Sequence, residues 1–394
     1  MREGWTETTL GKVAKCAGGS AFPIVHQNSQ IGIPFIKVSD MNIRGNEVEI
    51  ISALNHITSE LAKKLKVRVW PKDTVIFPKV GAALLTDKRR ILTRDTIFDN
   101  NIMGLIACDI IIPRFLFLFM TRIRMSDYVQ SGALPSISNG IVQEIEINLP
   151  PLQEQKRIVD LISSVDTYID ALQQQADCAR KSRNAVLHEM LSAGGDGWIY
   201  TTIGGVAEFI NTRRSPAELS PQDIYVGLEH LQPHDQSIST FGSVSQVSSS
   251  LTPFIAENIL FGRLRPYLHK VAFAEFSGYC SPEILVMSAK NDCIPRFLGF
   301  VCGLDSTISA CVEMSAGTRM PRTSVGDLSS INFNLPPKFR QQEIVDLISS
   351  VDNSIFAAEV TIAETKKLRS ALLADLLSGK HEIPASYDKI TGAG

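Results

Sequence analysis

The 394-residue sequence predicts an α+β protein. Two mixed, β-rich domains in a pseudo-two-fold arrangement are expected, separated by two long antiparallel coiled-coil helices. Three observations lead to this prediction. The chain repeats itself, each copy of the repeat ends in a heptad stripe of apolar residues, and the segments between the stripes carry apolar runs of strand length.

The internal repeat is visible at both ends of each copy. The nine residues 158–166 recur without change at 344–352, which is 186 positions later. The beginning of the chain repeats at an offset of 193, where residues 5–14 resemble residues 198–207. Nine identical residues in a row are hard to attribute to chance, so we infer that the chain arose by duplication.

Residues 1–150 and 194–336 are expected to form the two globular domains. Short apolar runs separated by turn residues predict strands at 34–38, 74–77, 146–149 and 284–287. Short helices are expected at 59–67 and 296–303. Between the anchors of the repeat the two domains diverge strongly in sequence.

Residues 151–193 and 337–380 are expected to form the two long helices, and residues 381–394 a loose tail. Each helical segment follows a Pro-Pro pair, which suits a first helical turn, and stops at glycine. Narrow apolar stripes with 4-3 spacing, over about four to five heptads, indicate a coiled-coil seam. At about 1.5 Å per residue, each helix would be roughly 60 Å long. The seam positions are Ile158, Ile162, Val165, Ile169, Leu172, Ala176, Ala179, Arg183, Val186 and Met190, and Ile344, Ile348, Val351, Ile355, Ala358, Ile362, Thr365, Arg369, Leu372 and Leu376.

One arginine interrupts the apolar seam of each helix. The second helix must return beside the first, and a symmetric antiparallel register places Arg183 level with Asp352 and Arg369 level with Asp166. A guanidinium group at the edge of an apolar seam requires a carboxylate partner. We therefore predict these two ion pairs between the helices.

The composition narrows the class of protein. With 44% hydrophobic and 20% charged residues, the chain can form two or three domains with cores. The formal net charge of −2 means that a nucleic-acid binder would have to concentrate its positive charge locally. No apolar run of about 18 residues predicts a membrane span, and the N-terminus lacks the apolar core of a signal peptide. Seven cysteines without a Cys-x-x-Cys pair suit reduced thiols, so a cytoplasmic protein is expected.

Catalytic signatures are absent from the sequence. It contains no phosphate-binding loop, no glycine-rich cofactor loop after a strand, and no Asn/Asp-Pro-Pro-Tyr type of tetrapeptide. His230 and His234 have helical spacing, but Pro233 between them favours a turn over a zinc site. Asp87 and Glu283 have no acidic companion at a spacing that suits a nuclease. We expect no catalytic residue, cofactor or metal in this chain.

Local positive charge is the remaining functional signal. Residues 60–94 carry ten basic residues against three acidic ones, and a second basic group in the other domain includes an aromatic residue. Guanidinium groups bind both phosphate oxygens and the O6/N7 edge of guanine. A solvated helix surface remains an alternative for residues 63–68. The candidate DNA-binding residues are Lys79, Lys88, Arg89, Arg90, Arg94, Arg263, Arg265, Tyr267, Lys270, Arg319 and Arg322.

Several of these motifs together resemble the specificity (S) subunits of Type I restriction-modification systems, the HsdS family. Residues 259–271, followed by 278–281, resemble a signature of that family. Residues 317–322, which lead to a Leu-Pro-Pro run and a long helix, are similar to the end of its target recognition domains. Residues 149–155 match the entry into its conserved helix. The resemblance covers essentially the whole chain.

The resemblance implies that each globular domain is a target recognition domain for one half of a bipartite, asymmetric site in double-stranded DNA. The helices would hold the domains apart and dock two methyltransferase (M) subunits, and two restriction (R) subunits could then join. S-adenosylmethionine, ATP and Mg²⁺ would be bound by those partner subunits. Domain one departs from domain two at residues 77–81 and 131–136, so its DNA contacts are less well defined.

Two other classes of protein remain open at this point. One is a coiled-coil scaffold whose globular domains bind other proteins, and the other is a single-chain nuclease or methyltransferase. The clustered Arg and Lys residues count against the first, and the missing motifs count against the second. Salt-dependent binding of a DNA duplex would separate a DNA reader from a protein scaffold.

Overall fold

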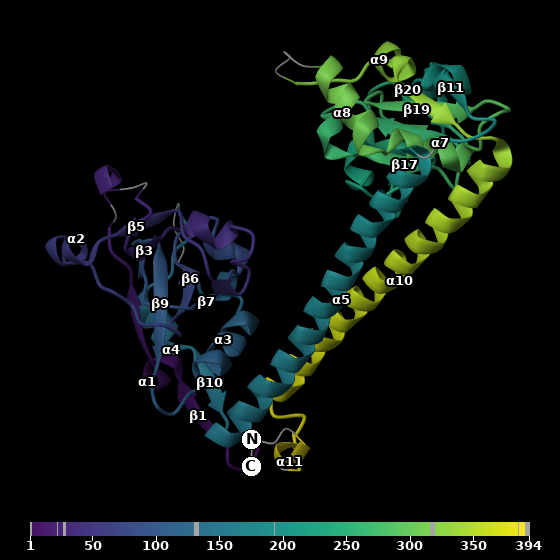
Figure 1. Ribbon diagram of the computed structural model, residues 1–394. Helices are drawn as coiled ribbons and strands as arrows, with labels where there is room; N and C mark the ends of the chain where they lie inside the picture. Colours follow the sequence, from purple (N-terminus) through teal and green to yellow (C-terminus); the bar gives the residue numbers. More distant parts are fainter. Residues whose placement is uncertain are drawn as a thin grey trace. The chain divides into compact units, whose positions relative to one another are not determined.

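The computed structural model describes residues 2–21, 23–26, 29–129, 134–192, 194–315, 320–384 and 386–390. The chain divides into two compact units. Unit 1 comprises Met1–Ala171 and Thr361–Gly394, and unit 2 comprises Leu172–Val360. Each unit therefore contains one globular domain and a part of each of the two long helices, α5 (Leu152–Ser192) and α10 (Lys338–Leu377) (Figure 1).

The globular domain of unit 1 contains a five-stranded sheet of order β2-β9-β6-β7-β4, a three-stranded sheet of order β5-β3-β8, and the pair β1-β10. Its strands are β1 Thr6–Thr9, β2 Ala14–Gly18, β3 Ile33–Ile36, β4 Glu49–Ile50, β5 Asn55–Ile57, β6 Val75–Pro78, β7 Arg90–Leu92, β8 Ile97–Phe98, β9 Ile102–Ala107 and β10 Glu146–Leu149. Its helices are α1 Leu10–Val13, η1 Ile24–His26, η2 Val38–Asn42, α2 Ser59–Lys64, η3 Leu84–Thr86, α3 Pro113–Arg122, η4 Met125–Tyr128 and α4 Asn139–Glu144, and the C-terminal α11 (Tyr387–Ile390) also belongs to unit 1.

The globular domain of unit 2 contains four-stranded sheets of order β12-β19-β16-β17 and β14-β13-β18-β15, and the pair β11-β20. Its strands are β11 Ile199–Thr202, β12 Ala207–Ile210, β13 Ile224–Val226, β14 Gly242–Ser243, β15 Thr252–Phe254, β16 Ile259–Gly262, β17 Val271–Phe273, β18 Gly278–Cys280, β19 Ile284–Ala289 and β20 Asn332–Leu335. Its helices are α6 Ile203–Val206, η5 Pro216–Glu218, η6 Leu228–His230, η7 Val244–Gln246, η8 Pro266–Leu268, α7 Pro295–Cys302, α8 Asp305–Met314 and α9 Val325–Ser330.

The two domains repeat one fold, as the sequence predicts. The order β12-β19-β16-β17 reproduces β2-β9-β6-β7, and the register of β11 with β20 reproduces that of β1 with β10. The parallel pair β13–β18 likewise matches β3–β8. The predicted α+β fold class, with mixed sheets and long helices, is therefore confirmed.

The ends of the long helices belong to the cores of the globular domains. Ile158 and Ile162 of α5 are buried in the main hydrophobic cluster of unit 1, together with Leu373 of α10. In unit 2, Ile344 and Ile348 of α10 are buried in the corresponding cluster. Each helix is thus anchored by apolar packing on its own domain and does not merely extend from it.

A buried glutamine joins the start of each long helix to its domain. The Gln155 side chain is fully buried, donates to the carbonyls of Ile110 (3.0 Å) and Pro150 (2.8 Å), and accepts from the Ile112 amide (2.8 Å). Gln341, 186 positions later, makes the same three bonds in unit 2: its side chain donates to the carbonyls of Asp292 and Pro336 and accepts from the Ile294 amide. This repeated contact sets the direction in which each helix leaves its domain.

Replacing Gln155 by Ala should lower the free energy of unfolding by roughly 3 kcal/mol, because buried backbone groups would lose their hydrogen-bond partners. Thermal unfolding and hydrogen exchange of the first turn of α5 would measure the effect. The exposed Gln174 on the same helix supplies the control, and Gln174→Ala should change stability by no more than about 0.5 kcal/mol. Equal effects of the two substitutions would contradict the anchoring role.

The two predicted ion pairs of the helical seam are confirmed. In unit 2, Arg183 binds Asp352 in a bidentate manner, with Nε–Oδ1 and Nη2–Oδ2 distances of 2.6 and 3.1 Å. In unit 1, Arg369 binds Asp166 in the same way, with an Nη2–Oδ2 distance of 2.8 Å. The two pairs define one antiparallel register for the helices.

The predicted seam differs from the observed one near its end. Leu187 and Leu373 are buried, whereas Val186, which the 4-3 spacing places in the seam, is 39% exposed. A straight α-helix has 3.6 residues per turn, so a strict heptad stripe drifts around it. Here the drift places Leu187 in the hydrophobic cluster of unit 2 and Leu373 in that of unit 1.

The segment after α10 is not the loose tail that the sequence suggests. Ile383 is buried in the cluster of unit 1, and Asp388 on α11 binds Arg157 of α5, with an Nη2–Oδ2 distance of 2.6 Å. The Arg157 guanidinium lowers the pKa of the Asp388 carboxyl to about 2. The residues that follow Ile390 lie outside the described part of the chain.

A search for membrane spans among the described residues yields no single helix that is long and apolar enough. The helices α7 and α8, which are bent at 57° to one another, together have the length and composition of a membrane span. Most of the apolar side chains of α7 are buried in the core of unit 2.

Candidate nucleic-acid interface

In unit 2 the predicted basic residues gather on the loop between β16 and β17. Three backbone hydrogen bonds fix this loop: Arg263 N to the Glu283 carbonyl (3.0 Å), Arg265 N to the Pro321 carbonyl (2.9 Å), and Thr323 N to the Arg263 carbonyl (2.9 Å). The residues before β17 and those before α9 are therefore held side by side. Positive charge from two distant parts of the sequence meets on one surface.

Three side chains of this loop pair are exposed. Arg265 has a left-handed backbone (φ +53°), Tyr267 is 51% exposed, and the Arg322 side chain is 53% exposed. Left-handed backbone is uncommon for a residue with a side chain, and at functional sites such strain often serves to aim a side chain. Two guanidinium groups and one aromatic ring are suited to contact phosphates and base edges.

The remaining predicted residues of unit 2 are less available for contact with DNA. Lys270 donates from Nζ to the Leu228 carbonyl at 2.6 Å. Arg263 is half-buried, and its Nε is enclosed without a hydrogen-bond partner among the described residues. Arg319 lies outside the described residues.

Unit 1 has the same loop with other side chains. Lys79 N donates to the Asn101 carbonyl (2.8 Å), Gly81 N to the Pro135 carbonyl (2.7 Å), and Ile137 N to the Lys79 carbonyl (3.0 Å). Gly81, like Arg265, has a positive φ (+74°), but glycine adopts it without strain. Lys79, half-buried, is the one basic residue that unit 1 places on the equivalent part of this loop.

Arg89 and Arg90 must be removed from the predicted interface, because both are buried. The Arg89 guanidinium donates to the carbonyls of Met120 (3.2 Å), Lys88 (3.1 Å) and Ile123 (2.9 Å). Arg90 donates to the carbonyls of Arg89 and Met41. Burial lowers the pKa of both side chains. Sequence could not separate these core arginines from exposed ones, because a run of basic residues carries no periodic signal of burial.

Two other predicted residues of unit 1 lie nearer the surface. The Lys88 ammonium donates to Asn42 Oδ1, and Arg94 is exposed. Lys88 is thus partly engaged within the domain. Arg94 remains a candidate for phosphate contact.

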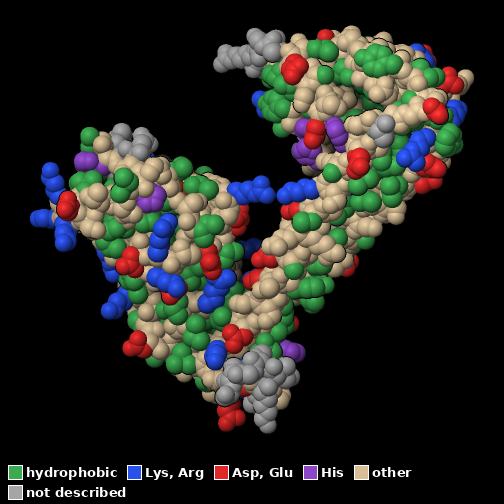
Figure 2. All heavy atoms as spheres, in the orientation of Figure 1, with side chains coloured by type: hydrophobic (Ala, Val, Ile, Leu, Met, Phe, Trp, Pro, Cys, Tyr) green, Lys and Arg blue, Asp and Glu red, His purple; other side chains and the backbone are tan. Residues whose placement is uncertain are grey.

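A group of exposed positive charges of unit 1 lies on α2 and the chain that follows it. Lys63, Lys64, Lys66 and Arg68 are all exposed, and the Arg68 guanidinium lies 4.0 Å from the centre of the Trp70 ring. Figure 2 shows Lys and Arg side chains gathered where Figure 1 places α2. The counterpart in unit 2, residues 244–251, contains no basic residue. The two domains therefore place positive charge on different elements.

Sequence reasoning missed two residues at the loop pair, Asn101 and Glu283. Each contributes the carbonyl that holds the loop after β6 or β16, and each stands at the same place in its domain. The Glu283 side chain also forms an ion pair with Arg322, with an Nη2–Oε1 distance of 2.9 Å. Only the pairing of β6 with β9 and of β16 with β19 reveals this equivalence.

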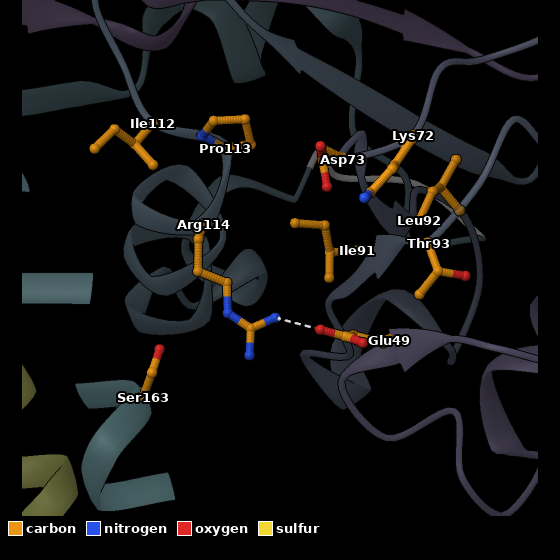
Figure 3. Close-up of a pocket in the computed structure, with 10 residues that line it drawn as sticks. All are labelled: Glu49, Lys72, Asp73, Ile91, Leu92, Thr93, Ile112, Pro113, Arg114 and Ser163. Carbon is orange, nitrogen blue, oxygen red and sulfur yellow. Dashed lines mark hydrogen bonds and ion pairs between the residues drawn. The ribbon is translucent and has the colours of Figure 1, made fainter. Parts of the chain in front are cut away.

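A pocket of about 580 Å³ in unit 1 is lined by none of the predicted DNA-binding residues, although Ile91, Leu92 and Thr93 on its wall lie between Arg90 and Arg94 in the sequence. Arg114, on the first turn of α3, forms an ion pair with Glu49 at an Nη1–Oε1 distance of 3.1 Å. Figure 3 shows this pair, with Lys72 and Asp73 across the pocket. Ser163 of α5 closes one side. In unit 2, Arg296 at the same place on α7 faces Glu275 at 3.9 Å. The charges that line the pocket include both signs, so it does not concentrate positive charge.

The two histidines with helical spacing do not share a helix, because His230 ends the short helix η6 and His234 lies in the turn that follows. His230 Nδ1 accepts the Gly227 amide at 2.9 Å, and the His234 ring stacks on His269 with ring centres 4.2 Å apart. Among the described residues, no group of three or more His, Cys, Asp or Glu side chains is arranged to hold a metal ion.

Family models, curated relatives and solved structures that match this chain all point to one family. The model of the Type I restriction modification DNA specificity domain matches residues 2–177 and 195–365. The chain is 23% identical over 327 residues to the EcoDI specificity subunit of a Type I restriction enzyme of Escherichia coli, a match that covers 68% of this chain and 73% of the relative. It is 20% identical over 415 aligned positions to the MjaIX specificity subunit of Methanocaldococcus jannaschii, covering 95% and 93%.

Solved structures show the same fold. The S subunit of a Type I restriction-modification system from M. genitalium matches with a TM-score of 0.52 at 13% identity, over 96% of this chain and 97% of that one. A chain from a structural study of complex assembly and conformational transition in the type I R-M system matches with a TM-score of 0.57 at 16% identity, over 96% and 98%.

Proposed function

This chain belongs to the family of Type I restriction-modification specificity subunits, and on that premise we propose that its two target recognition domains read the two halves of one split, asymmetric DNA site. Members of this family supply DNA sequence recognition within a restriction-modification complex and are not catalytic themselves. The proposal concerns how this chain divides that recognition between its domains.

One observation carries the proposal: a repeated fold presents different side chains at equivalent positions. The loop after β16 offers Arg263 and Arg265, whereas the loop after β6 offers Lys79 and Gly81. A symmetric dimer with identical readers recognises a palindrome. Two non-identical readers on a duplicated scaffold should recognise two different half-sites.

The exposed cations divide into two expected roles. Lys63, Lys64 and Arg68 around α2 are suited to phosphates, which give affinity and strong salt dependence without sequence preference. Arg265 and Arg322 lie on fixed loops and are suited to base edges in the major groove. Binding should therefore weaken with salt while the base preference remains.

We propose two methyltransferase subunits and two restriction subunits as partners, docked through the long helices. S-adenosylmethionine, ATP and Mg²⁺ would be held by those subunits. Modification of an adenine would require the base to flip out of the duplex into the pocket of a methyltransferase partner. We place this assembly in the cytoplasm.

Expression of the chain with its methyltransferase partner in a host without other modification tests the proposal. Sequencing of methylated bases should reveal one split, non-palindromic motif. The purified chain alone, supplied with S-adenosylmethionine, should modify nothing. Methyl transfer by the chain alone, or a continuous palindromic motif, would contradict the proposal.

Arg265→Ala should weaken binding of the half-site of domain two by roughly 1–3 kcal/mol and relax the preference at one base position. Arg265→Lys is the matched control, because it keeps the charge but loses the bidentate geometry. If Arg265 reads guanine, both variants lose the base preference. If it binds phosphate, Lys substitutes well and Ala weakens all sequences evenly, with a shallower dependence on salt.

A further inference from the structure

We infer that Arg322, oriented by Glu283, reads a guanine in the half-site of unit 2, and that Asn101 and Ser136 make unit 1 select a different base at the equivalent position. This inference rests on the proposed function and assigns one position of the site. Arg322 is the base-reading residue in this scheme, and Glu283 is a positioning residue.

The equivalence of the two positions follows from backbone hydrogen bonds. In unit 2, Leu264 forms a β-bridge with Arg322, and in unit 1 Val80 forms the same bridge with Ser136. The next residue donates its amide to the carbonyl of Pro321 in one unit and of Pro135 in the other. Arg322 and Ser136 therefore occupy one place in the fold.

Glu283 and Asn101 are equivalent by the same criterion. Glu283 accepts the Arg263 amide, and Asn101 accepts the Lys79 amide, each through its carbonyl. In unit 2 the next residue, Ile284, begins β19, which pairs with β16. In unit 1 the next residue, Ile102, begins β9, which pairs with β6. The turn residue and the bridge residue are therefore matched between the domains, and in unit 2 an ion pair joins their side chains.

In unit 2 the ion pair between Glu283 and Arg322 lets Glu283 influence base reading only by orienting Arg322. Glu283 Oε1 accepts Arg322 Nη2 at 2.9 Å, and its Oε2 is buried without a hydrogen-bond partner among the described residues. An enclosed oxygen cannot reach a base. A guanidinium has five N–H donors, and the ion pair uses one of those of Arg322, whose side chain is 53% exposed. The carboxylate therefore restrains the orientation of Arg322 and leaves other donors directed to the surface.

Charge favours a base over a phosphate as the target of this pair. Arg322 and Glu283 together are neutral, so a phosphate brought to the guanidinium would also approach the carboxylate and be repelled by it. The O6 and N7 atoms of guanine are uncharged acceptors that a restrained guanidinium can bind in a bidentate manner. The exposed Arg265 nearby forms no ion pair with a carboxylate among the described residues, so this argument against a phosphate does not apply to it.

Unit 1 carries a different set of groups at the same place. Asn101 is exposed, and both its backbone N–H, at 2.9 Å from Asp99 Oδ1, and its side chain are hydrogen-bonded to the Asp99 carboxylate. This contact orients the Asn101 amide and leaves its oxygen and one N–H for a base. Ser136 is half-buried. Neither side chain is charged, so no guanidinium is available there for guanine. An asparagine amide presents a donor and an acceptor, the pattern that matches adenine. The two half-sites should therefore differ at this position.

The test uses the complete methyltransferase complex with wild-type chain, Arg322→Lys, Glu283→Gln and the double variant Glu283→Asn with Arg322→Ser. Selection of bound duplexes from a pool randomised over both half-sites gives the preference at every position. Loss of the Arg322 guanidinium in the double variant should reduce the preference for guanine at one position of the second half-site by about 5- to 150-fold. Arg322→Lys, which keeps the charge but lacks the planar fork, should reduce it less. Glu283→Gln should reduce it at the same position, and the double variant should replace guanine by the base that domain one prefers there.

Two further measurements separate base reading from a structural role. The Tm of the double variant complex and its salt dependence of binding should stay close to wild type, because a neutral ion pair is replaced by two neutral side chains. The reciprocal change, Asn101→Glu with Ser136→Arg in unit 1, should introduce guanine into the first half-site and leave the second intact. This gain of preference cannot arise from destabilisation, so it tests the inference even if a unit 2 variant folds poorly.

The outcomes are distinct. An even loss of affinity across all sequences, with a shallower salt slope, would assign Arg322 to a phosphate and overturn the inference. An unchanged guanine preference in the double variant, which has no cation at this position, would also overturn it, while the wild-type complex still reads a split site. A wild-type complex that selects no split sequence would overturn the proposed function itself, and this inference with it.

Discussion

Insertion of seven residues after Gln173 and seven after Glu359 should abolish modification at the natural gap length and create modification at a longer gap. One heptad in each helix preserves the phase of the apolar seam, so the antiparallel pair should still form. The added length is about 10 Å, equivalent to roughly three base pairs at about 3.4 Å each. Three base pairs also rotate the second half-site by roughly 100°, so a complex that cannot follow this rotation would lose most of its activity.

Methylated-base sequencing of a host that expresses the variant with its methyltransferase partner would measure the gap directly. The control inserts two residues at each site, which takes the seam out of phase and should damage folding instead. The ion pairs Arg183–Asp352 and Arg369–Asp166 provide a check on register, because both should survive the heptad insertion. Full modification at the original spacing would show that the helices do not set the gap.

Exchange of residues 1–150 for the equivalent part of another specificity subunit should change one half of the recognised sequence completely and leave the other half intact. The physical reason is that each domain has its own hydrophobic clusters and its own loop pair, fixed by hydrogen bonds within that domain. The junction should keep Leu149, Pro150 and Gln155, because Gln155 ties the start of α5 to the domain.

The motif methylated by the chimeric complex is the measurement, and the reciprocal exchange of residues 194–336 is its control. The two chimeras should alter complementary halves of the site. A change in both halves from either exchange would show that the domains are not independent readers. Thermal unfolding of each chimera would show whether the new domain still packs on Ile158 and Ile162 of the retained helix.

Much of the architecture was predictable from sequence because it depends on periodicity and repetition. The 4-3 spacing predicts both helices, and the position of one arginine in each stripe predicts the partners Asp352 and Asp166. Such predictions succeed because seam packing depends on positions along a single regular element. Near Leu187 the prediction is wrong by one residue, because contact with the domain outweighs the heptad spacing there.

The candidate interface was only partly predictable, and burial is the reason. Arg89 and Arg90 belong to the same basic run as Lys88 and Arg94, yet their guanidinium groups satisfy backbone carbonyls inside the domain. A sequence lists charges but does not show which of them lie beneath the surface. In addition, α2 and the chain that follows it carry exposed cations, whereas the counterpart segment of the second domain, residues 244–251, carries none.

The sequence by itself determined the duplication, the two long helices with their register, and membership of a DNA-reading family by resemblance. Those features are written in identical residues or in a regular period. Alignment of the two copies of the repeat already sets residues 77–81 against 261–265 and residues 131–136 against 317–322. Only the tertiary structure decided that Asn101 is equivalent to Glu283, because each holds the aligned loop through its carbonyl. The segments around these residues have little sequence in common. Their equivalence arises from hydrogen bonds between strands and loops that are far apart in the chain. The side chains that differ at equivalent positions of the two domains are therefore found by matching backbone contacts.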